Sequence, residues 1–516
     1  MQRLSSRARS LRHARYALRR TLRPLAVAAA ASTALAMAGC SLFAPSGKPP
    51  AMPSPAHYGA EPLPVQTVAA QGVAQRFEVG AQPVPEWWKH YRSPQLDALV
   101  DEGLRASPTL AASTHALQAA REQLRAQIGS SLLPSIDLGG QTARQRGLGV
   151  PNLGPTTALY NLFEGQLQAS YTIDLFGASR FANRELQKRV DVTAFQLDSA
   201  RRALAANIVT ATITSAALAE QVQATERLVA LARAQADDAV RRNRLGSASR
   251  ADMLSAQQSA ASVEASLPAL RQQWLSARHA LAVLLGRTPD QAPADLALAD
   301  LHLPESVPVA VPSTLLETRP DIRAADASLQ AAAAAVGVAT AQMFPQISLS
   351  ASLGQAGFSW PAALSGIGGI WSVGASLSQP LFHGGALLAQ RRAAQASYAA
   401  AVEQYKATVL TAFQNVADSL AALDNDAQAL DASSRAAEAA RGASDDTAAR
   451  VRLGALPPSA GRSSEQQYRN AQLDAIRATG SRLADTARLF QAMGTPPEPA
   501  QAGKAATVAA ASGAGS

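Results

Sequence analysis

The sequence predicts a mainly α-helical protein with a small β portion, in which one structural unit occurs twice. Long stretches place apolar residues at steps of three, four and seven, a spacing typical of helices that pack along their length. Short stretches between them alternate apolar and polar residues, which is typical of strands with one apolar face. The same motifs recur in the same order at offsets near 206 to 212 residues, which indicates a duplicated body.

The duplication rests on several pairs of matching segments. "SPTLAASTHALQAAREQ" begins at Ser107 and "RPDIRAADASLQAAAAA" begins at Arg319, and in each case a proline ends the helix before alternating residues follow. Further pairs are "DLFG" with "PLFHGG", "RNRLGSAS" with "ARVRLGAL", and "LLGRTPD" with "AMGTPPE". We therefore expect one repeat over 83–300 and a second over 301–495. Each should contain a short helix, a pair of strands, a very long helix and a returning helix.

The first 39 residues have the features of a secretion signal. They hold eight arginines and no acidic residue, and their apolar run Leu25–Ala36 is too short to span a bilayer as a helix. Ala38, Gly39 and Cys40 form a small-small-Cys ending that resembles the lipobox of bacterial lipoproteins, whose cysteine carries a diacylglycerol. We expect a signal peptide over 1–39 and lipid modification of Cys40. The alternative is an ordinary signal peptide with a chance cysteine.

Removal of residues 1–39 changes what the charge implies. The whole chain has a formal charge of +9, and without the eight arginines of the signal the mature chain keeps +1 (9 − 8). The basic balance of the chain is therefore no argument for nucleic-acid binding, because most of it lies in the discarded part. Cys40 is the only cysteine, so once it is acylated no thiol remains for a disulfide, a Cys-ligated metal or a cysteine nucleophile.

Composition also marks the ends of the mature chain. Residues 40–82 are rich in Pro, Ala and Gly and predict a tether between the lipid and a structured body that begins near Glu86. Residues 496–516 form an Ala/Gly/Ser-rich tail, which we expect to be disordered.

Each repeat contains two strand-like segments, and the clearest ones have an apolar and a polar face. In "GQLQASYTID" the apolar face consists of Leu167, Ala169, Tyr171 and Ile173. In "QISLSASLG" it consists of Ile347, Leu349, Ala351 and Leu353. The Gly/Pro-rich stretches 144–161 and 354–369 lie between the paired strands and predict loops.

The longest helices follow the strands. From Arg180 to Arg244 a continuous helix would measure ~100 Å at ~1.5 Å per residue, far more than a globular domain requires. Heptad spacing in Leu197–Val229 and again in Tyr398–Leu423 predicts coiled-coil packing. A long soluble coiled-coil protein would show the same helical pattern, so the strands decide the class.

Strands with one apolar face suit a wall between lipid and water, but one chain supplies too few of them. Bacterial transmembrane barrels need about eight or more strands, since no strand edge can stay open in lipid. Two pairs per chain fall short, whereas a homotrimer would supply a twelve-stranded barrel. No mature segment appears in the sequence as an apolar helix of about 20 residues, so a helical membrane span is not expected.

With these features the chain resembles the outer-membrane efflux protein family, the TolC-like channels, and within it the NodT-type lipoproteins, over about residues 40–495. The resemblance is carried by the lipobox-like ending and by "EWWKHYRSPQLDAL", "SPTL", "YTIDLFG", "RRNRLGSASRADMLSAQQ", "RPDIRAA", "FPQISL" and "QPLFHGG". It implies a lipid-anchored homotrimer in the outer membrane of a Gram-negative bacterium. The twelve-stranded barrel would continue into an α-helical barrel through the periplasm.

The resemblance also implies the partners and the mode of action. The channel would dock on a periplasmic membrane-fusion adaptor coupled to an inner-membrane pump, for which we expect the RND type of multidrug efflux. Transport would be passive conduction without a chemical step, so no enzyme activity and no cofactor are expected. A type I protein secretion duct is the alternative on the same fold, and a lipid-anchored periplasmic coiled-coil scaffold is the alternative of another class.

The resemblance places adaptor docking at two helix-hairpin tips. The matching residues are Arg244, Leu245, Gly246 and Ser247 in the first repeat and Arg452, Leu453, Gly454 and Ala455 in the second. Glycine permits the left-handed turn that reverses two antiparallel helices, so a purely structural turn would show the same residue.

Channels of this family often close their periplasmic end with acidic residues beyond the second tip. Here that stretch has Ala460 and Ser463 instead, and only the first tip keeps an acid, Asp252. We therefore expect any constriction to involve Leu456, Arg462 or Asp252 rather than a ring of carboxylates.

The remaining chemical motifs point to structure rather than catalysis. Trp87 and Trp88 could stack on a sugar or a base, but packing against the helices is the favoured interpretation. His383 lies in a glycine-containing turn without further ligands, so we expect no metal site. The sequence has no nucleophile elbow, HExxH or Walker motif, and we expect no catalytic residue.

Overall fold

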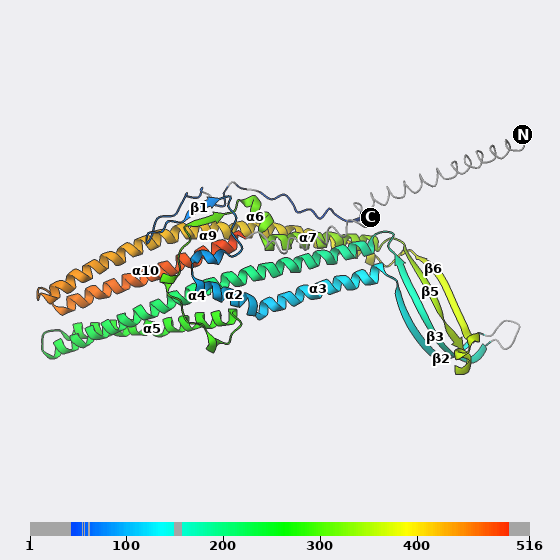
Figure 1. The fold of residues 1–516 in the computed structure, drawn as a ribbon, viewed down its shortest axis with the longest axis horizontal. Coiled ribbons are helices and arrows are strands. Elements are labelled where there is room, and N and C mark those ends of the chain that lie inside the picture. Colours follow the sequence, from blue (N-terminus) through cyan, green and yellow to red (C-terminus); the bar gives the residue numbers. More distant parts are fainter. Residues whose placement is uncertain (1–42, 54, 56, 60–61, 149–156, 495–516) are drawn as a thin grey trace, which may run out of the picture. The chain divides into compact units, whose positions relative to one another are not determined.

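The computed structural model describes residues 43–53, 55, 57–59, 62–148 and 157–494, and the signal peptide, Cys40 and the C-terminal tail lie outside them. Figure 1 shows the fold. The elements in chain order are β1 (Arg76–Val79), η1 (Trp87–Tyr91), α2 (Pro94–Ala106), α3 (Pro108–Leu132), β2 (Ser135–Leu148), β3 (Thr157–Ile173), α4 (Ala178–Arg244), α5 (Arg250–Leu284), η2 (Pro289–Gln291), η3 (Leu298–Asp300), β4 (Ser306–Val309), α6 (Pro312–Thr318), α7 (Pro320–Ala341), β5 (Gln346–Gly357), α8 (Trp360–Leu364), η4 (Gly366–Gly368), β6 (Gly369–Ser378), α9 (Ala386–Arg452) and α10 (Pro458–Met493).

The element order contains the expected unit twice. α3, β2, β3, α4 and α5 recur as α7, β5, β6, α9 and α10. The two long helices α4 and α9 have 67 residues each, so a helix of ~100 Å is present in both repeats. Ala386 lies 208 positions after Ala178 (386 − 178), within the range of offsets that the sequence motifs show.

The chain folds into two compact units, and each takes residues from both repeats. The sheet unit consists of the described residues up to Pro50 together with 118–191 and 326–404. The hairpin unit consists of the described residues of 51–117, 192–325 and 405–516. The two units thus do not follow the boundary between the repeats.

In the sheet unit, β2, β3, β5 and β6 form a four-stranded antiparallel sheet in that order (Figure 1). β3 pairs with β5, so the sheet joins the strand pairs of the two repeats. The prediction of a loop over 144–161 is wrong at both ends of that stretch, because 144–148 pairs with 157–161. Backbone hydrogen bonds extend a strand beyond the point where its side chains stop alternating.

In the hairpin unit, α4 with α5 and α9 with α10 form two helical hairpins (Figure 1). Their core contains a cluster of aromatic residues contributed by η1 and α10. The ring of Trp87 stacks on Phe490 with centroids 5.2 Å apart, and the Tyr91 hydroxyl donates a 2.8 Å hydrogen bond to the Leu483 carbonyl. Trp87 and Trp88 are both buried, which agrees with a packing role and leaves neither ring free to stack on a ligand.

The expected start of the structured body near Glu86 is too late. β1 pairs in parallel with β4, and the segment before it packs into the hairpin unit. The fully buried guanidinium of Arg482 donates to the Thr67 hydroxyl and the Gln75 side-chain carbonyl, each at 3.2 Å. A buried cation requires such acceptors, so this part of the predicted tether completes the core.

One helix does satisfy the length and composition of a membrane span, contrary to the sequence analysis. α4 contains an 18-residue stretch that is apolar enough, but 56% of it is buried within the structure. Packing against neighbouring helices accounts for the apolar character of this stretch.

A pair of carboxyl groups lies beside Arg482 in the same unit. The pKa of Asp426 is raised to about 7, first by burial and then by a hydrogen bond with Asp485 and repulsion from the Asp485 charge. The positive charges of Arg488 and Arg482 act to lower this pKa. The folded state therefore favours protonated Asp426, whereas the unfolded chain releases that proton near pH 4. The resulting stabilisation is complete below pH 4 and is lost as the pH rises through about 7.

We predict that Asp426→Asn flattens the pH dependence of thermal stability between pH 5 and 8. The amide keeps the shape of a protonated carboxyl group and does not ionise, so the drop in Tm on going to pH 8 should shrink by roughly 2–4 °C. Thermal unfolding of the purified protein followed by circular dichroism measures this effect. Asp418→Asn changes an exposed acid on the same helix and should keep the wild-type pH dependence. If Asp426→Asn showed the same drop in Tm between pH 5 and 8 as the wild type, the raised pKa of Asp426 would be contradicted.

Candidate functional sites: a two-faced sheet and two hairpin tips

The register of the sheet places side chains of one kind in rows across three or four strands. The apolar rows are Leu138–Leu167–Leu353–Trp371, Ile136–Ala169–Ala351–Val373 and Ile173–Ile347–Leu377. The polar rows between them are Asp137–Gln168–Ser352–Ser372 and Thr172–Ser348–Ser376. The predicted apolar faces of the two repeats thus combine into one continuous face.

Both faces are open in the single chain. On the apolar face Val373 and Trp371 are each 76% exposed. A continuous apolar face is unfavourable in contact with water, so such a face marks a site of contact with lipid or protein. On the polar face hydroxyl groups bond across strands, as between Ser352 and Ser372 at 2.9 Å. A sheet with one apolar and one polar face separates a nonpolar medium from an aqueous one.

Aromatic residues lie at the end of the sheet away from the helices. Phe163, on the apolar face, packs on Trp360 with ring centroids 4.9 Å apart, and Tyr160, at a polar-face position of β3, packs on Phe358 at 5.3 Å. From Phe163 to Ile173 the strand rises about 34 Å at ~3.4 Å per residue, or about 25 Å along the normal for a tilt of about 40°. This equals the height of the apolar band between the aromatic girdles of membrane barrels.

The two predicted tips have the same backbone structure. At the first tip the Gly246 N–H donates to the Asn243 carbonyl and the Ser247 N–H to the Arg242 carbonyl, at 3.0 and 2.8 Å. At the second tip Gly454 donates to Val451 at 3.0 Å, and Ala455 donates to the Arg450 carbonyl at 2.9 Å. Both patterns are Schellman motifs that end a helix at a glycine with positive φ, +73° and +75°.

The side chains at the tips are exposed and partly apolar. Leu245 is 82% exposed and Leu453 is 84% exposed, and both turns lie at the same end of the hairpin unit (Figure 1). Among the described residues, no acidic partner lies within ion-pair distance of Arg244, Arg250 or Arg452. The tips therefore present leucine and uncompensated positive charge to solvent, which suits a partner with apolar and acidic groups.

The three residues expected at a constriction have other contacts in the single chain. Asp252 forms a capping box with Ser249 at the start of α5, and hydrogen bonds from Ser249 lower the pKa of its carboxyl group. Arg462 forms a 2.6 Å ion pair with Asp238 and so joins α10 to α4. Leu456 is half-buried just before α10, which begins with Pro458 in the first turn, where proline is tolerated.

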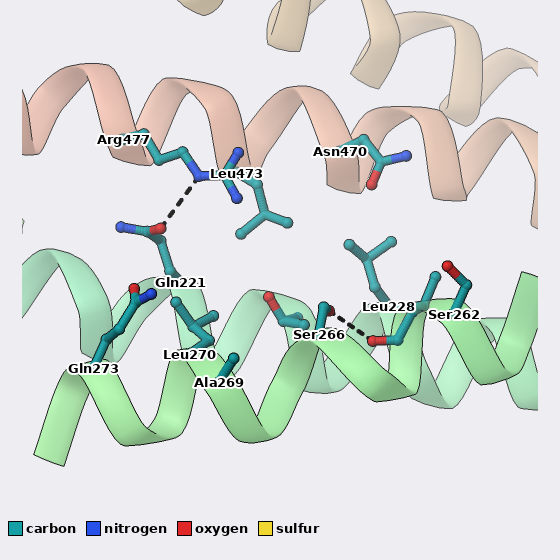
Figure 2. Close-up of a pocket in the computed structure, with 12 residues that line it drawn as sticks. Gln221, Leu228, Ser262, Ser266, Ala269, Leu270, Gln273, Asn470, Leu473 and Arg477 are labelled. Atoms are coloured by element: carbon teal, nitrogen blue, oxygen red, sulfur yellow. Dashed lines mark hydrogen bonds between the residues drawn. The ribbon is translucent and has the colours of Figure 1, made fainter.

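A crevice of about 560 Å³ lies between α5 and α10 over α4 (Figure 2). Two of its polar groups bond within the protein: Arg477 donates to the Gln221 side-chain carbonyl at 3.2 Å, and the Ser266 hydroxyl donates to the Val263 carbonyl at 2.7 Å. The described residues hold no group of three or more His, Cys, Asp or Glu side chains that could bind a metal ion. The crevice has the character of a gap between packed helices rather than of a reaction site.

Sequence reasoning missed several of these features. The two aromatic pairs at the far end of the sheet come from separate segments, and only the register brings them together. The ion pair of Arg462 with Asp238 joins residues 224 positions apart, for which the sequence holds no signal.

A comparison with known families and proteins agrees with this geometry. A family model described as "Outer membrane efflux protein" matches residues 99–287 and 311–495, one segment in each repeat. The chain is 32% identical over 349 residues to the pyoverdine export outer membrane protein OpmQ of Pseudomonas putida, which covers 66% of this chain and 73% of that protein. It is 30% identical over 403 residues to the probable efflux pump outer membrane protein TtgC of Pseudomonas putida, covering 76% and 79% respectively.

Among solved structures, the chain is similar to the open state of the MtrE outer membrane channel of Neisseria gonorrhoeae. The TM-score is 0.71 at 25% sequence identity, and the match covers 87% of this chain and 98% of that one. The family match spans both repeats, and the same fold accounts for the two-faced sheet and the paired hairpins. The chain belongs to the outer membrane efflux protein family.

Proposed function

We propose that three copies of this chain form a channel that conducts substrates passively across the outer membrane. The observation that carries the proposal is the two-faced sheet, whose outer strands β2 and β6 have no partner strand among the described residues. In lipid every backbone N–H and C=O group must be paired, so these edges require neighbouring copies. Three sheets of four strands would close a twelve-stranded barrel.

The polar rows would line the pore of such a barrel. Side chains such as Gln168 and Ser352 hydrogen-bond to water, so a solute could pass in hydrated form without contacting lipid. No step of the passage breaks or forms a covalent bond, and the energy would come from elsewhere in the assembly. The long helices would continue the duct as an α-helical barrel in the periplasm.

As a family member, the chain serves as the outer-membrane component of a tripartite efflux system. We assign the adaptor contact to the tips at Arg244–Ser247 and Arg452–Ala455, and we assign the energy supply to an inner-membrane pump of the RND type. Lipid modification of Cys40 after removal of residues 1–39 would hold the mature chain at the outer membrane. We assign any constriction at the periplasmic end of the duct to Leu456, Arg462 and Asp252.

Single-channel conductance of the purified protein in planar lipid bilayers tests the proposal. We expect discrete, trimer-sized conductance steps. A trimer without conductance would favour the periplasmic scaffold instead. Export of a polypeptide rather than of small molecules by cells that carry the intact system would favour the type I secretion duct.

We predict that a charge on the apolar face of the sheet prevents membrane assembly. Val373→Arg should cost about 2–4 kcal/mol per copy if Val373 faces lipid near the middle of the bilayer. Heat-modifiable migration of the folded protein on SDS gels measures assembly. Ser372→Arg is the matched control, because Ser372 lies on the polar face one residue away. It should assemble and change only conductance, whereas equal assembly of both variants would contradict the lipid-facing role.

We also predict that Gly454→Val abolishes export while trimers still reach the outer membrane. Nothing lies within 4 Å of the added Cβ, so the effect would come from forcing a β-branched residue into φ +75°, at about 1–2 kcal/mol. Crosslinking to the adaptor in cells and drug susceptibility measure the loss. Gly442→Val adds the same side chain in open space within helix α9 and should export normally. Normal export by Gly454→Val would refute the docking role.

A further inference from the structure

Three phenylalanines meet at the helix end of the sheet. Phe43 lies 4.9 Å from Phe344 and 6.5 Å from Phe176 between ring centroids, and the latter two stack on each other at 5.0 Å. Phe176 follows β3 and Phe344 precedes β5, so the two central strands of the sheet meet this cluster. Phe43 adds the N-terminal segment of the chain to it.

The residues after Phe43 also pack against the sheet unit. Gly47 is buried with φ +64°, and an added Cβ there would lie 3.2 Å from Cβ of Ala333 and 3.6 Å from Cα of Gln330, both on α7. A side chain at this position would be strained by the positive φ and would also push against α7, so glycine is favoured here. The segment 43–47 is therefore held at two points, by an aromatic cluster and by contact with α7.

Exposed apolar residues surround this end of the sheet. The register brings the ends of all four strands together there, and three of the four junctions between strand and helix carry exposed large apolar side chains outside the phenylalanine cluster. We call these residues the collar: Leu132, Leu133, Leu175, Leu381 and Phe382. Leu381 is 92% exposed and Phe382 is 86% exposed in the single chain.

We propose that Phe43 is a positioning residue that fixes the lipid of Cys40 at the level of the collar, and that membrane acyl chains cover the collar. The inference rests on the lipid modification proposed above. Cys40 precedes Phe43 by three residues, so their Cα atoms are at most about 11 Å apart. Because the cluster holds Phe43 beside the strand ends, the acyl chains enter the bilayer next to the collar.

This arrangement sets the depth of the sheet in the membrane. The apolar rows end at Ile173, Ile347 and Leu377, and the collar continues the apolar surface beyond them. A lipid attached through a free tether could insert anywhere within its reach. A lipid attached three residues before a packed aromatic side chain is confined to within about 11 Å of that side chain's Cα.

Amide hydrogen exchange on the full-length acylated protein in phospholipid nanodiscs tests the role of Phe43. Phe43→Ala should raise the exchange rates of residues 43–50 at least tenfold, and Phe43→Tyr should restore protection because its ring can pack in the same place. Phe358→Ala disrupts the aromatic pair at the opposite end of the sheet and should leave residues 43–50 protected. Wild-type protection in Phe43→Ala would overturn the proposal.

The environment of the collar is tested with a nitroxide attached to Leu381→Cys. This cysteine is the only free thiol once Cys40 is acylated. In the nanodisc the label should be accessible to oxygen and protected from a water-soluble nickel chelate. The matched control is Leu245→Cys at a hairpin tip, a leucine of similar exposure that should be accessible to the chelate.

Two outcomes of the nitroxide experiment would overturn the assignment of lipid to the collar. Access to the nickel chelate would place the collar in water, and protection from both reagents would place it against a second copy of the chain. Mass spectrometry of the N-terminal peptide tests acylation of Cys40 separately. An unmodified Cys40 would refute the lipid anchor of the proposed function, whereas the exchange experiment would still report whether Phe43 holds the segment.

Discussion

The backbone hydrogen-bonding groups at the two edges of the four-stranded sheet limit how this chain can enter a membrane. Within the part of the chain that the structure describes, β2 and β6 each have a partner strand on one side only, and each unpaired backbone group would cost several kcal/mol in lipid. The two edges belong to different strands, so β6 of one copy would pair with β2 of the next. Such head-to-tail pairing closes into a ring when the rotation between copies allows it.

The duplication gives the chain two hairpins with nearly the same construction but different surfaces. α4 and α9 have equal lengths and end in the same Schellman turn. The returning helices begin differently, with a Ser249–Asp252 capping box in α5 and with Pro457 and Pro458 in α10. An adaptor that contacts both tips would therefore meet the same Arg-Leu-Gly turn twice, followed by returning helices that begin with different side chains.

The segment before the first repeat has a structural role in each unit. Gly47 packs against α7 in the sheet unit, while Thr67 and Gln75 accept hydrogen bonds from buried Arg482 in the hairpin unit. Its high proline, alanine and glycine content is typical of a linker. The contacts of Gly47, Thr67 and Gln75 nevertheless hold it against the two units, and composition does not reveal such individual contacts.

The duplication, the two-faced strands, the long helices and the glycine turns could all be predicted from local sequence patterns, because each depends on residues that are close in the chain or on a repeated pattern. Period two fixes which residues share a strand face, and glycine marks a backbone turn wherever it occurs. The tertiary structure adds which strands are neighbours, that Arg462 pairs with Asp238, and that Phe43 joins Phe176 and Phe344. These contacts depend on how distant segments pack, and local patterns carry no information about such distances.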